Sequence, residues 1–335
     1  MTEPTPESFR ALRIHQDEDV TRSDIETLTL NQLSAGDIVI RVRWSSLNYK
    51  DALAATGEGK ILRTSPLNGG IDAAGTVIHS NHPGIKIDQA VLVTGYGLSQ
   101  THDGGYADYI RVPGEWVIPL PNALDPRSAM ILGTAGLTAA LALHRLELNG
   151  VAPTSGPILV SGASGGVGSI AINLLSDQGY QVIALSGKPD QHGYLKRLGA
   201  DDVLLRTNMD FSHRPLQKAR WAGAIDTAGG AILDWLISTT QPWGCIASIG
   251  MAAGTTLNTS VMPFILRGVG LLGITSAGCP TELRHQLWQK LGSEWKPSKL
   301  EDIVTNTVTL DTLQPTFRAM LDGKTHGRTL VKIES

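Results

Sequence analysis

Residues 158–175 read ILVSGASGGVGSIAINLL, an apolar run that breaks at a cluster of glycine and serine and then becomes amphipathic. The three decisive places of a G-x-G-x-x-G turn are held by Ala163, Gly165 and Gly168. Glycine at 165 lets the backbone approach a pyrophosphate, and glycine at 168 lets the helix pack on the strand. Alanine fits the first place if its φ is negative. Because a strand precedes the turn and a helix follows it, the pattern predicts a dinucleotide site rather than a turn that binds nothing.

The backbone of this turn is the expected phosphate ligand, because a helix N-terminus carries unpaired N–H groups and the positive end of its dipole. The residues that we expect to contact the cofactor here are Ala163, Ser164, Gly165, Gly166 and Val167.

The end of the next predicted strand indicates which dinucleotide fits. NAD sites place Asp or Glu there to bind the ribose hydroxyls, whereas this chain has Ser186, Gly187 and Lys188. A carboxylate would repel a 2′-phosphate, while a hydroxyl, a free N–H and an ammonium would bind it. Arg206 ends the following strand at the same edge of the sheet and is a second candidate. The missing acid favours NADPH over NADH; the alternative is that both cations are plain surface charges.

Composition excludes several classes of protein. Lys and Arg number 28 against 31 Asp and Glu, which argues against a nucleic-acid partner or an anionic membrane surface. The two cysteines, Cys245 and Cys279, cannot form a disulfide framework or a cysteine-rich zinc lobe. The N-terminus is polar and acidic, so no signal peptide is expected, and we expect no membrane-spanning segment. A cytoplasmic protein is the default.

The first part of the chain is predicted to be rich in short strands. Residues 37–47, DIVIRVRWSSL, alternate apolar and polar side chains, and further short strands follow with Gly and Pro between them. Such strands indicate a partly open barrel. A helix is predicted from Pro126 onward, with Asp125 as its N-cap.

From residue 157 onward, strand and helix patterns alternate, which predicts a parallel sheet with helical crossovers. Asp226 ends one of these strands and is expected to bind backbone or cap the next helix. Cys245 lies in another apolar strand and is expected to be an inert core thiol. The last predicted strand, in residues 326–334, HGRTLVKIE, returns to the first domain.

The chain resembles the medium-chain dehydrogenase/reductase superfamily over nearly its whole length. The shared stretches read WSSLNYKDALA, GIDAAGTV, SGASGGVG, VMPFILR and GRTLVK. The resemblance implies an α/β protein with a GroES-like, partly open β-barrel domain in residues 1–129 and 277–335 and a Rossmann domain, a doubly wound parallel sheet, in residues 130–276. It is greatest to the bacterial NADPH-dependent acrylyl-CoA reductases. That family implies an α,β-unsaturated acyl-CoA substrate, reduced at its carbon–carbon double bond.

Alcohol dehydrogenases of this superfamily bind catalytic zinc through a Cys and a Gly-His-Glu segment. The corresponding places here hold Asn48 and the segment Gly70, Ile71 and Asp72. An amide and an isoleucine do not replace a thiolate and an imidazole, so no metal site is expected. The absence of a metal favours reduction of a double bond that is already electron-poor.

The segment LNYKD is the predicted wall of the catalytic site. The Asn48 amide could donate to the nicotinamide ribose or to substrate, and Tyr49 offers an aromatic face and a phenol. Lys50 could pair with a phosphate or a carboxylate, whereas Asp51 is expected to bind local backbone. Domain packing is the alternative for Tyr49, and bulk water is the alternative proton donor.

Further cofactor contacts follow from the fold and from the resemblance. Gly250 ends a strand at the carboxyl edge of the sheet, and the resemblance adds Met251, Ile265 and Ser276. Arg328 in GRTLVK could face a phosphate of the cofactor or of CoA, or be a plain surface charge.

Two rival functions remain open at this level. One is a zinc-free NADPH reductase of quinones or alkenals, and the other is an NADPH-binding sensor or structural protein without turnover. A homodimer is also expected, with its contact near residues 268–277, GVGLLGITSA, which are long and apolar.

Overall fold

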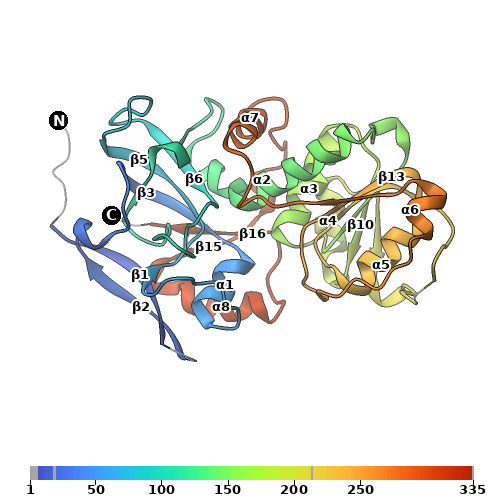
Figure 1. Cartoon of the computed structure of the whole chain (residues 1–335), viewed down its shortest axis with the longest axis horizontal. Coiled ribbons are helices and arrows are strands. Elements are labelled where there is room, and N and C mark those ends of the chain that lie inside the picture. Colours follow the sequence, from blue (N-terminus) through green and yellow to red (C-terminus); the bar gives the residue numbers. More distant parts are fainter. Residues whose placement is uncertain (1–6, 18–19, 213, 334–335) are drawn as a thin grey trace. The chain divides into compact units, whose positions relative to one another are not determined.

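The structure is a computed structural model that describes residues 7–17, 20–212 and 214–333, and it divides into two compact units (Figure 1). Unit 1 comprises Met1–Thr134, Ala277–Ser293 and Val304–Ser335, and unit 2 comprises Ala135–Ser276 and Glu294–Ile303.

These boundaries differ from the predicted ones in two places. The first lies after Thr134 rather than after residue 129. The second difference is that residues 294–303 belong to unit 2, because side chains of a unit 2 helix bind their backbone. Ser298 N donates to Asp177 Oδ2 at 2.7 Å, and Lys299 N donates to Asn173 Oδ1 at 2.9 Å. No local pattern marks that short segment.

Unit 1 is built on two sheets. The larger has the strand order β15-β16-β3-β5-β6-β8 with β7 on β3, and the smaller has the order β2-β1-β4. The last strand returns to pair antiparallel with β3, as predicted. The strands are β1 (Phe9–Asp17), β2 (Val20–Leu28), β3 (Ile38–Leu47), β4 (Leu67–Asn68), β5 (Asp72–Ser80), β6 (Ala90–Thr94), β7 (Tyr109–Val112), β8 (Ile118–Pro119), β15 (Val304–Thr309) and β16 (Arg328–Lys332).

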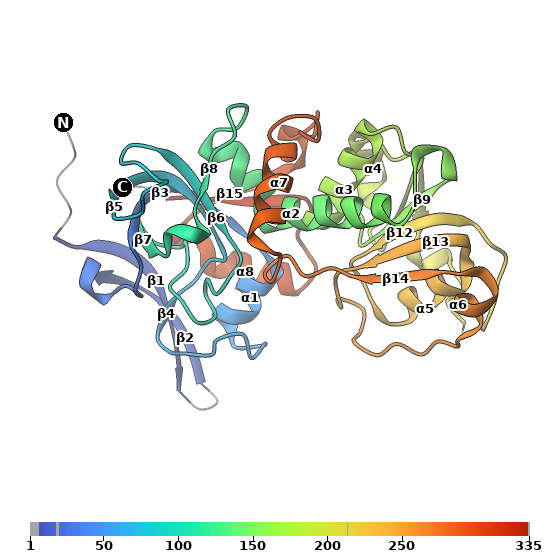
Figure 2. The same ribbon diagram turned by 45° about the horizontal axis from the view of Figure 1, so that its top comes forward.

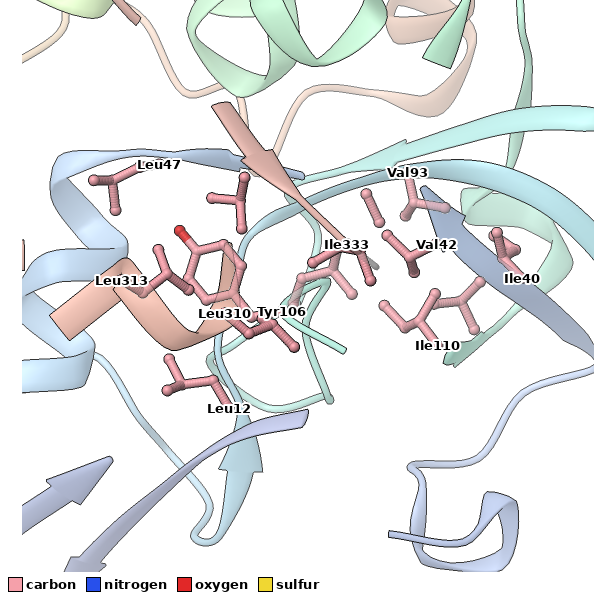
Figure 3. Packing of buried hydrophobic residues seen from close by; sticks show 14 of the residues in the cluster. Leu12, Ile40, Val42, Leu47, Val93, Tyr106, Ile110, Leu310, Leu313 and Ile333 are labelled. Carbon is pink, nitrogen blue, oxygen red and sulfur yellow. The ribbon is translucent and has the colours of Figure 1, made fainter. Parts of the chain in front are cut away.

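The core of unit 1 follows from the alternation in β3. Ile38, Ile40 and Val42 lie at every second position and are all buried. They belong to a cluster in which Tyr106 is the largest side chain shown (Figure 3). The helices of this unit are α1 (Tyr49–Thr56), α7 (Thr281–Leu291) and α8 (Leu313–Leu321), with short 3₁₀ turns at Leu30–Gln32, Gly114–Trp116 and Leu310–Thr312.

Unit 2 is a single parallel sheet with helices on both sides. The order β11-β10-β9-β12-β13-β14 reverses direction between β9 and β12, as in doubly wound dinucleotide folds. Helices α3 and α4 lie on one side, and α5 and α6 lie on the other (Figure 2). The elements are β9 (Ile158–Ser161), α3 (Gly166–Asp177), β10 (Val182–Ser186), α4 (His192–Leu198), β11 (Asp202–Leu205), β12 (Trp221–Asp226), α5 (Gly230–Thr239), β13 (Thr240–Ser248), α6 (Met262–Arg267) and β14 (Gly270–Gly273), with 3₁₀ turns at Pro153–Ser155, Pro189–Gln191, Arg206–Asn208 and Glu301–Ile303.

The helix α2 (Pro126–Leu148) begins in unit 1 and ends in unit 2. Asp125 caps its start, since its Oδ1 accepts from Ser128 N at 2.6 Å, as predicted. The helix is interrupted at Gly133, whose φ is +51°. Contrary to expectation, α2 is long and apolar enough to cross a membrane by length and composition, but 83% of that apolar window is buried. Buried core helices pass the same test.

Two elements depart from the predicted pattern. β14 covers only Gly270–Gly273, so it is shorter than the apolar segment that predicts it. No regular alternation predicts the antiparallel pair β1–β2, because only Ser23 and Leu28 of β2 are buried.

Candidate cofactor and substrate sites

The glycine turn has the predicted shape, with one shift. The left-handed residue is Gly162, with φ +57°, whereas Ala163 lies outside the left-handed region and is buried. Gly165 is the N-cap of α3. A Cβ at Gly168 would lie 2.5 Å from the carbonyl oxygen of Gly162, so only glycine fits there. The structure therefore explains the alanine and the last glycine of the motif.

The open side of this turn is formed by Gly162 and Gly165, which are exposed, while Gly166 and Val167 are partly buried. Ser164 is buried. Of the five predicted contacts in the turn, the backbone of Gly165 and of the two residues after it is therefore the most accessible to a phosphate.

Asp226 joins the ends of β9 and β12 at the switch point of the sheet. Its Oδ1 accepts from Ser161 Oγ at 2.5 Å, and its carboxylate accepts from the backbone N–H groups of Ala228 and Gly229 at 3.2 and 2.9 Å. Burial raises the pKa of Asp226. The prediction that this residue binds backbone is confirmed. Its side chain holds together the ends of β9 and β12 at the edge of the sheet where a ligand would bind.

A small cavity of about 110 Å³ lies at this edge of unit 2 and gathers three of the predicted residues. Ser186, Gly187 and Arg206 all line it, and a Cβ at Gly187 would lie 3.4 Å from the guanidinium carbon of Arg206. Among the described residues that line it, none is Asp or Glu. The lining residues that the motif did not single out are Gly162, Leu185, Thr227, Ala228, Ile232, Ala252 and Ala253.

Lys188 lies beside this cavity without lining it. Its backbone N–H donates to Ser186 Oγ at 3.1 Å, and burial lowers the pKa of its amine. Gly250 follows β13, and a Cβ there would lie 2.2 Å from Thr227 O.

The remaining predicted contacts of unit 2 do not line the cavity either. Ile265 on α6 is 71% exposed, Met251 is exposed, and Ser276 is partly buried. Their roles toward a cofactor stay predictions.

In unit 1, the LNYKD segment joins the end of β3 to the start of α1. Asn48 is the N-cap of α1, and Tyr49 is its first residue with 49% exposure. Asp51 is buried, and its two oxygens accept from Asn48 N and Ile71 N, each at 2.9 Å. The prediction that Asp51 binds local backbone is confirmed. Burial, together with nearby Asp72, raises its pKa to about 7.

The buried carboxylate of Asp72 accepts hydrogen bonds from this segment and its neighbours. The sequence motifs did not predict this role. Its Oδ2 accepts from Ser46 Oγ at 2.6 Å and from Asn48 Nδ2 at 2.8 Å. Its Oδ1 accepts from the backbone and hydroxyl of Thr134 at 2.9 and 2.6 Å. Four donors from two separate parts of the chain, residues 46–48 and Thr134, thus converge on one carboxylate.

The expectation that Arg328 is a surface cation or faces a phosphate is wrong. The residue is 2% exposed, and its Nη2 lies 4.0 Å from Asp72 Oδ2. Its Nε donates to Ile131 O at 2.9 Å, and its Nη1 donates to Asn48 Oδ1 at 3.0 Å. Burial lowers the pKa of the guanidinium, and Asp72 opposes that shift. Arg328 is therefore an interior counterion.

These contacts leave the Asn48 amide fully occupied. Its Nδ2 donates to Asp72 and also to Asp51 at 3.1 Å, while its Oδ1 accepts from Arg328. Asn48 would have to give up one of these bonds to donate to a ligand, which revises the predicted direct role. Tyr49 is the residue of the segment that this network presents to solvent.

The same donor set does not fit a zinc ion. Amide and hydroxyl donors already occupy both oxygens of Asp72, and the thiolate and imidazole positions hold Asn48 and Ile71. Within the part of the chain that the structure describes, no three His, Cys, Asp or Glu side chains are placed to hold a metal.

Comparison with known families matches each half of the chain. Residues 34–122 match the alcohol dehydrogenase GroES-like domain, and residues 166–293 match the family described as zinc-binding dehydrogenase. "Probable acrylyl-CoA reductase AcuI" of Escherichia coli is 47% identical over 97% of this chain and 100% of its own length.

The chain belongs to the medium-chain dehydrogenase/reductase superfamily. The predicted membership and α/β fold class are confirmed. "Acrylyl-CoA reductase AcuI" of Ruegeria pomeroyi is 38% identical over 98% of this chain and 100% of its own. "Putative quinone oxidoreductase YhfP" of Bacillus subtilis is 42% identical over 97% and 99%.

Two solved structures of this superfamily overlie nearly the whole chain. The yhdH oxidoreductase of Salmonella enterica, in complex with NADP, has a TM-score of 0.93 and 46% identity over 97% of this chain and 100% of that one. Bacillus subtilis protein yhfP, with NAD bound, has a TM-score of 0.94 and 42% identity over 97% and 99%. The superfamily uses nicotinamide cofactors, and this chain is an oxidoreductase.

Proposed function

We propose that this chain is an NADPH-dependent reductase of the carbon–carbon double bond of short α,β-unsaturated acyl-CoA thioesters, converting acryloyl-CoA to propanoyl-CoA. The observation that carries the cofactor choice is the cavity of unit 2, where Ser186, Gly187 and Arg206 meet without a carboxylate. The substrate choice is supported by full-length relatives named as acrylyl-CoA reductases.

The residues of unit 2 fit NADPH. The exposed backbone of Gly162 and Gly165 leaves room for the pyrophosphate, and Arg206 and the Ser186 hydroxyl offer donors to a 2′-phosphate. Lys188 adds a second cation beside the cavity. When bound, the cofactor supplies a hydride. Asp226 keeps the strand ends beneath it in place.

In unit 1 we propose that the N-terminus of α1 binds the thioester. Hydride addition at the β-carbon of an acryloyl thioester leaves negative charge on the thioester oxygen, which hydrogen-bond donors would stabilise. Tyr49 carries an exposed phenol that can donate there, and Asn48 holds the start of the helix through its bonds to Asp51 and Asp72. Tyr49 stays the proposed catalytic residue, and Asn48, predicted to be catalytic, is now proposed to position it.

An acceptor panel tests the proposal. The purified chain is mixed with NADPH, and the loss of NADPH absorbance is followed on adding acryloyl-CoA, crotonyl-CoA or a quinone. Oxidation with acryloyl-CoA supports the proposal. Oxidation with quinone alone would support the second candidate, a zinc-free quinone oxidoreductase, which the name of the YhfP relative favours. No oxidation with any acceptor would leave a protein that binds NADPH without turnover.

We also propose a cytoplasmic homodimer. β14 is an edge strand, and exposed apolar side chains gather on the neighbouring part of unit 2, namely Trp243, Val261, Ile265 and Leu266. An exposed edge and an apolar patch favour pairing with a second copy. Light scattering that gives a monomeric mass at working concentration would contradict this.

A further inference from the structure

Three cations of unit 1 cluster along the segment that carries α1 and the coil after it. Lys50 lies in the first turn of α1, and Lys60 and Arg63 lie in the coil. Lys50 is partly buried, whereas Lys60 and Arg63 are exposed. Consecutive residues are at most about 3.6 Å apart along an extended chain, so the Cα atoms of Lys60 and Arg63 are within about 11 Å.

One residue ties this cluster together. Gln100 Oε1 accepts from Lys50 Nζ at 3.2 Å, and the carbonyl oxygen of Gln100 accepts from Arg63 N at 2.7 Å. The Lys50 ammonium and the Arg63 backbone therefore lie close together, because both bind Gln100. Ser99, the residue before Gln100, has φ +55° and is buried, so this loop has a defined and strained path.

The cluster differs from several other cations of the unit, which form ion pairs. Arg10, Arg22 and Arg318 each form an ion pair with a carboxylate. Among the residues that the structure describes, no carboxylate forms an ion pair with Lys50, Lys60 or Arg63.

The nearby acids compensate for only part of this charge, because the one that acts electrostatically on Lys50 is the buried Asp51. Glu58, two residues before Lys60, is paired with Arg318, and Asp51 is buried with its oxygens bonded to Asn48 and Ile71. The segment thus presents positive charge toward solvent right after the predicted catalytic residues. A group of cations that forms no ion pair attracts a multiply charged anion.

We propose that Lys50, Lys60 and Arg63 bind the phosphates of the acyl-CoA, so that they select thioesters carried by the phosphorylated nucleotide over thioesters of phosphate-free carriers. This inference rests on the proposed function. An acryloyl group offers no charge for recognition, whereas its carrier has a diphosphate and a 3′-phosphate. Two ammonium groups and one guanidinium fork match those groups in number and sign.

The test uses the double variant Lys60→Ala/Arg63→Ala and two substrates, acryloyl-CoA and acryloyl-pantetheine, which lacks every phosphate of the nucleotide. Exposed charge pairs are worth up to about fivefold each. The KM for acryloyl-CoA should rise about tenfold, with kcat unchanged. The KM for acryloyl-pantetheine and the KM for NADPH should not change.

Lys86→Ala is the matched control, because Lys86 is an exposed lysine of unit 1 on the connection between β5 and β6 and also has no ion pair within the described ranges. This variant should leave all three constants unchanged. An equal rise for both thioesters, or no rise for either, would overturn the proposal, as would a loss of NADPH affinity in the double variant.

A binding measurement separates this proposal from the proposed function. Calorimetry of free CoA with the wild-type chain and the double variant needs no turnover, and dephospho-CoA shows whether the 3′-phosphate is the contact. Weaker CoA binding in the double variant supports the cluster even if no acceptor is reduced. Equal CoA binding by both proteins would contradict it even if acryloyl-CoA is reduced.

Discussion

Thr134 binds Asp72 through two atoms, its backbone N–H at 2.9 Å and its hydroxyl at 2.6 Å from the same carboxylate oxygen. The carboxylate therefore caps the part of α2 that follows the break at Gly133, much as a side chain at an N-cap would. The same carboxylate holds Asn48, so one buried group fixes both a helix start and the predicted catalytic segment.

Gly133→Ala should destabilise the chain. The residue has φ +51°, and an added Cβ would lie 2.6 Å from Asp72 Oδ2 and 2.8 Å from Ser46 Oγ. With ψ −152° this backbone conformation is used almost only by glycine and costs about 1–3 kcal/mol for another residue, and the close approach adds to that cost. Thermal unfolding measures the loss. Gly150→Ala is the control, because its φ is +84° but nothing lies within 4 Å, and it should lose less. Equal losses would show that the Asp72 contact does not matter.

Asp51→Asn should alter how stability depends on pH. The pKa of Asp51 is about 7 in the folded chain and 3.8 ordinarily, so the folded state keeps a proton that the unfolded chain releases. The free energy of unfolding therefore falls as pH rises from about 4 to 7, by up to about 4 kcal/mol.

The measurement is the melting temperature of wild type and variant across that range. Asp51→Asn should remove part of the decline, and Asp24→Asn, an exposed acid of the same unit, should not. Parallel curves for wild type and Asp51→Asn would refute the raised pKa.

Gly168→Ala should impair folding of the turn, and Gly165→Ala should impair binding more than folding. A Cβ at Gly168 would lie 2.5 Å from Gly162 O, whereas at Gly165 it would lie 3.2 Å away, on the exposed side. We expect a melting temperature several degrees lower for the first and near wild type for the second. NADPH titration by fluorescence should show weaker binding in both. Normal NADPH affinity in Gly165→Ala would place the pyrophosphate elsewhere.

Arg206→Ala should weaken NADPH binding about tenfold or more and leave NADH binding nearly unchanged, because hydrogen bonds to charged groups are worth about 1.5–3 kcal/mol. Lys188→Ala should shift the same ratio in the same direction. Arg220→Ala is the control, since Arg220 is exposed in unit 2 and does not line the cavity. Equal losses of both cofactors in Arg206→Ala would count against a 2′-phosphate contact, and the NAD-bound yhfP relative makes this comparison informative.

Local patterns predicted the parts of the fold that depend on local physics. The alternation in β3 and the glycine turn before α3 each specify their own geometry, and Asp226 could be placed because a strand end offers backbone donors nearby. The residues at the edge of unit 2 that line the cavity, Ser186, Gly187 and Arg206, could be predicted for the same reason.

The hydrogen bonds inside unit 1 could not be predicted from the sequence, because they join distant parts of the chain. Ser46, Asp72, Thr134 and Arg328 come from four separate elements, and no spacing indicates that they meet. An arginine next to threonine in a terminal strand looks like a surface charge until its counterion is known. The roles of Asn48 and Arg328 therefore had to be revised from the structure.

The most direct test of the central claim follows the hydride itself. NADPH carrying deuterium at both C4 positions of its nicotinamide is incubated with the chain and acryloyl-CoA, and the product is analysed by mass spectrometry and NMR. The account predicts propanoyl-CoA with one deuterium on its β-carbon and none on its α-carbon. Deuterium absent from the product, or no propanoyl-CoA while a quinone consumes the labelled cofactor, would contradict it.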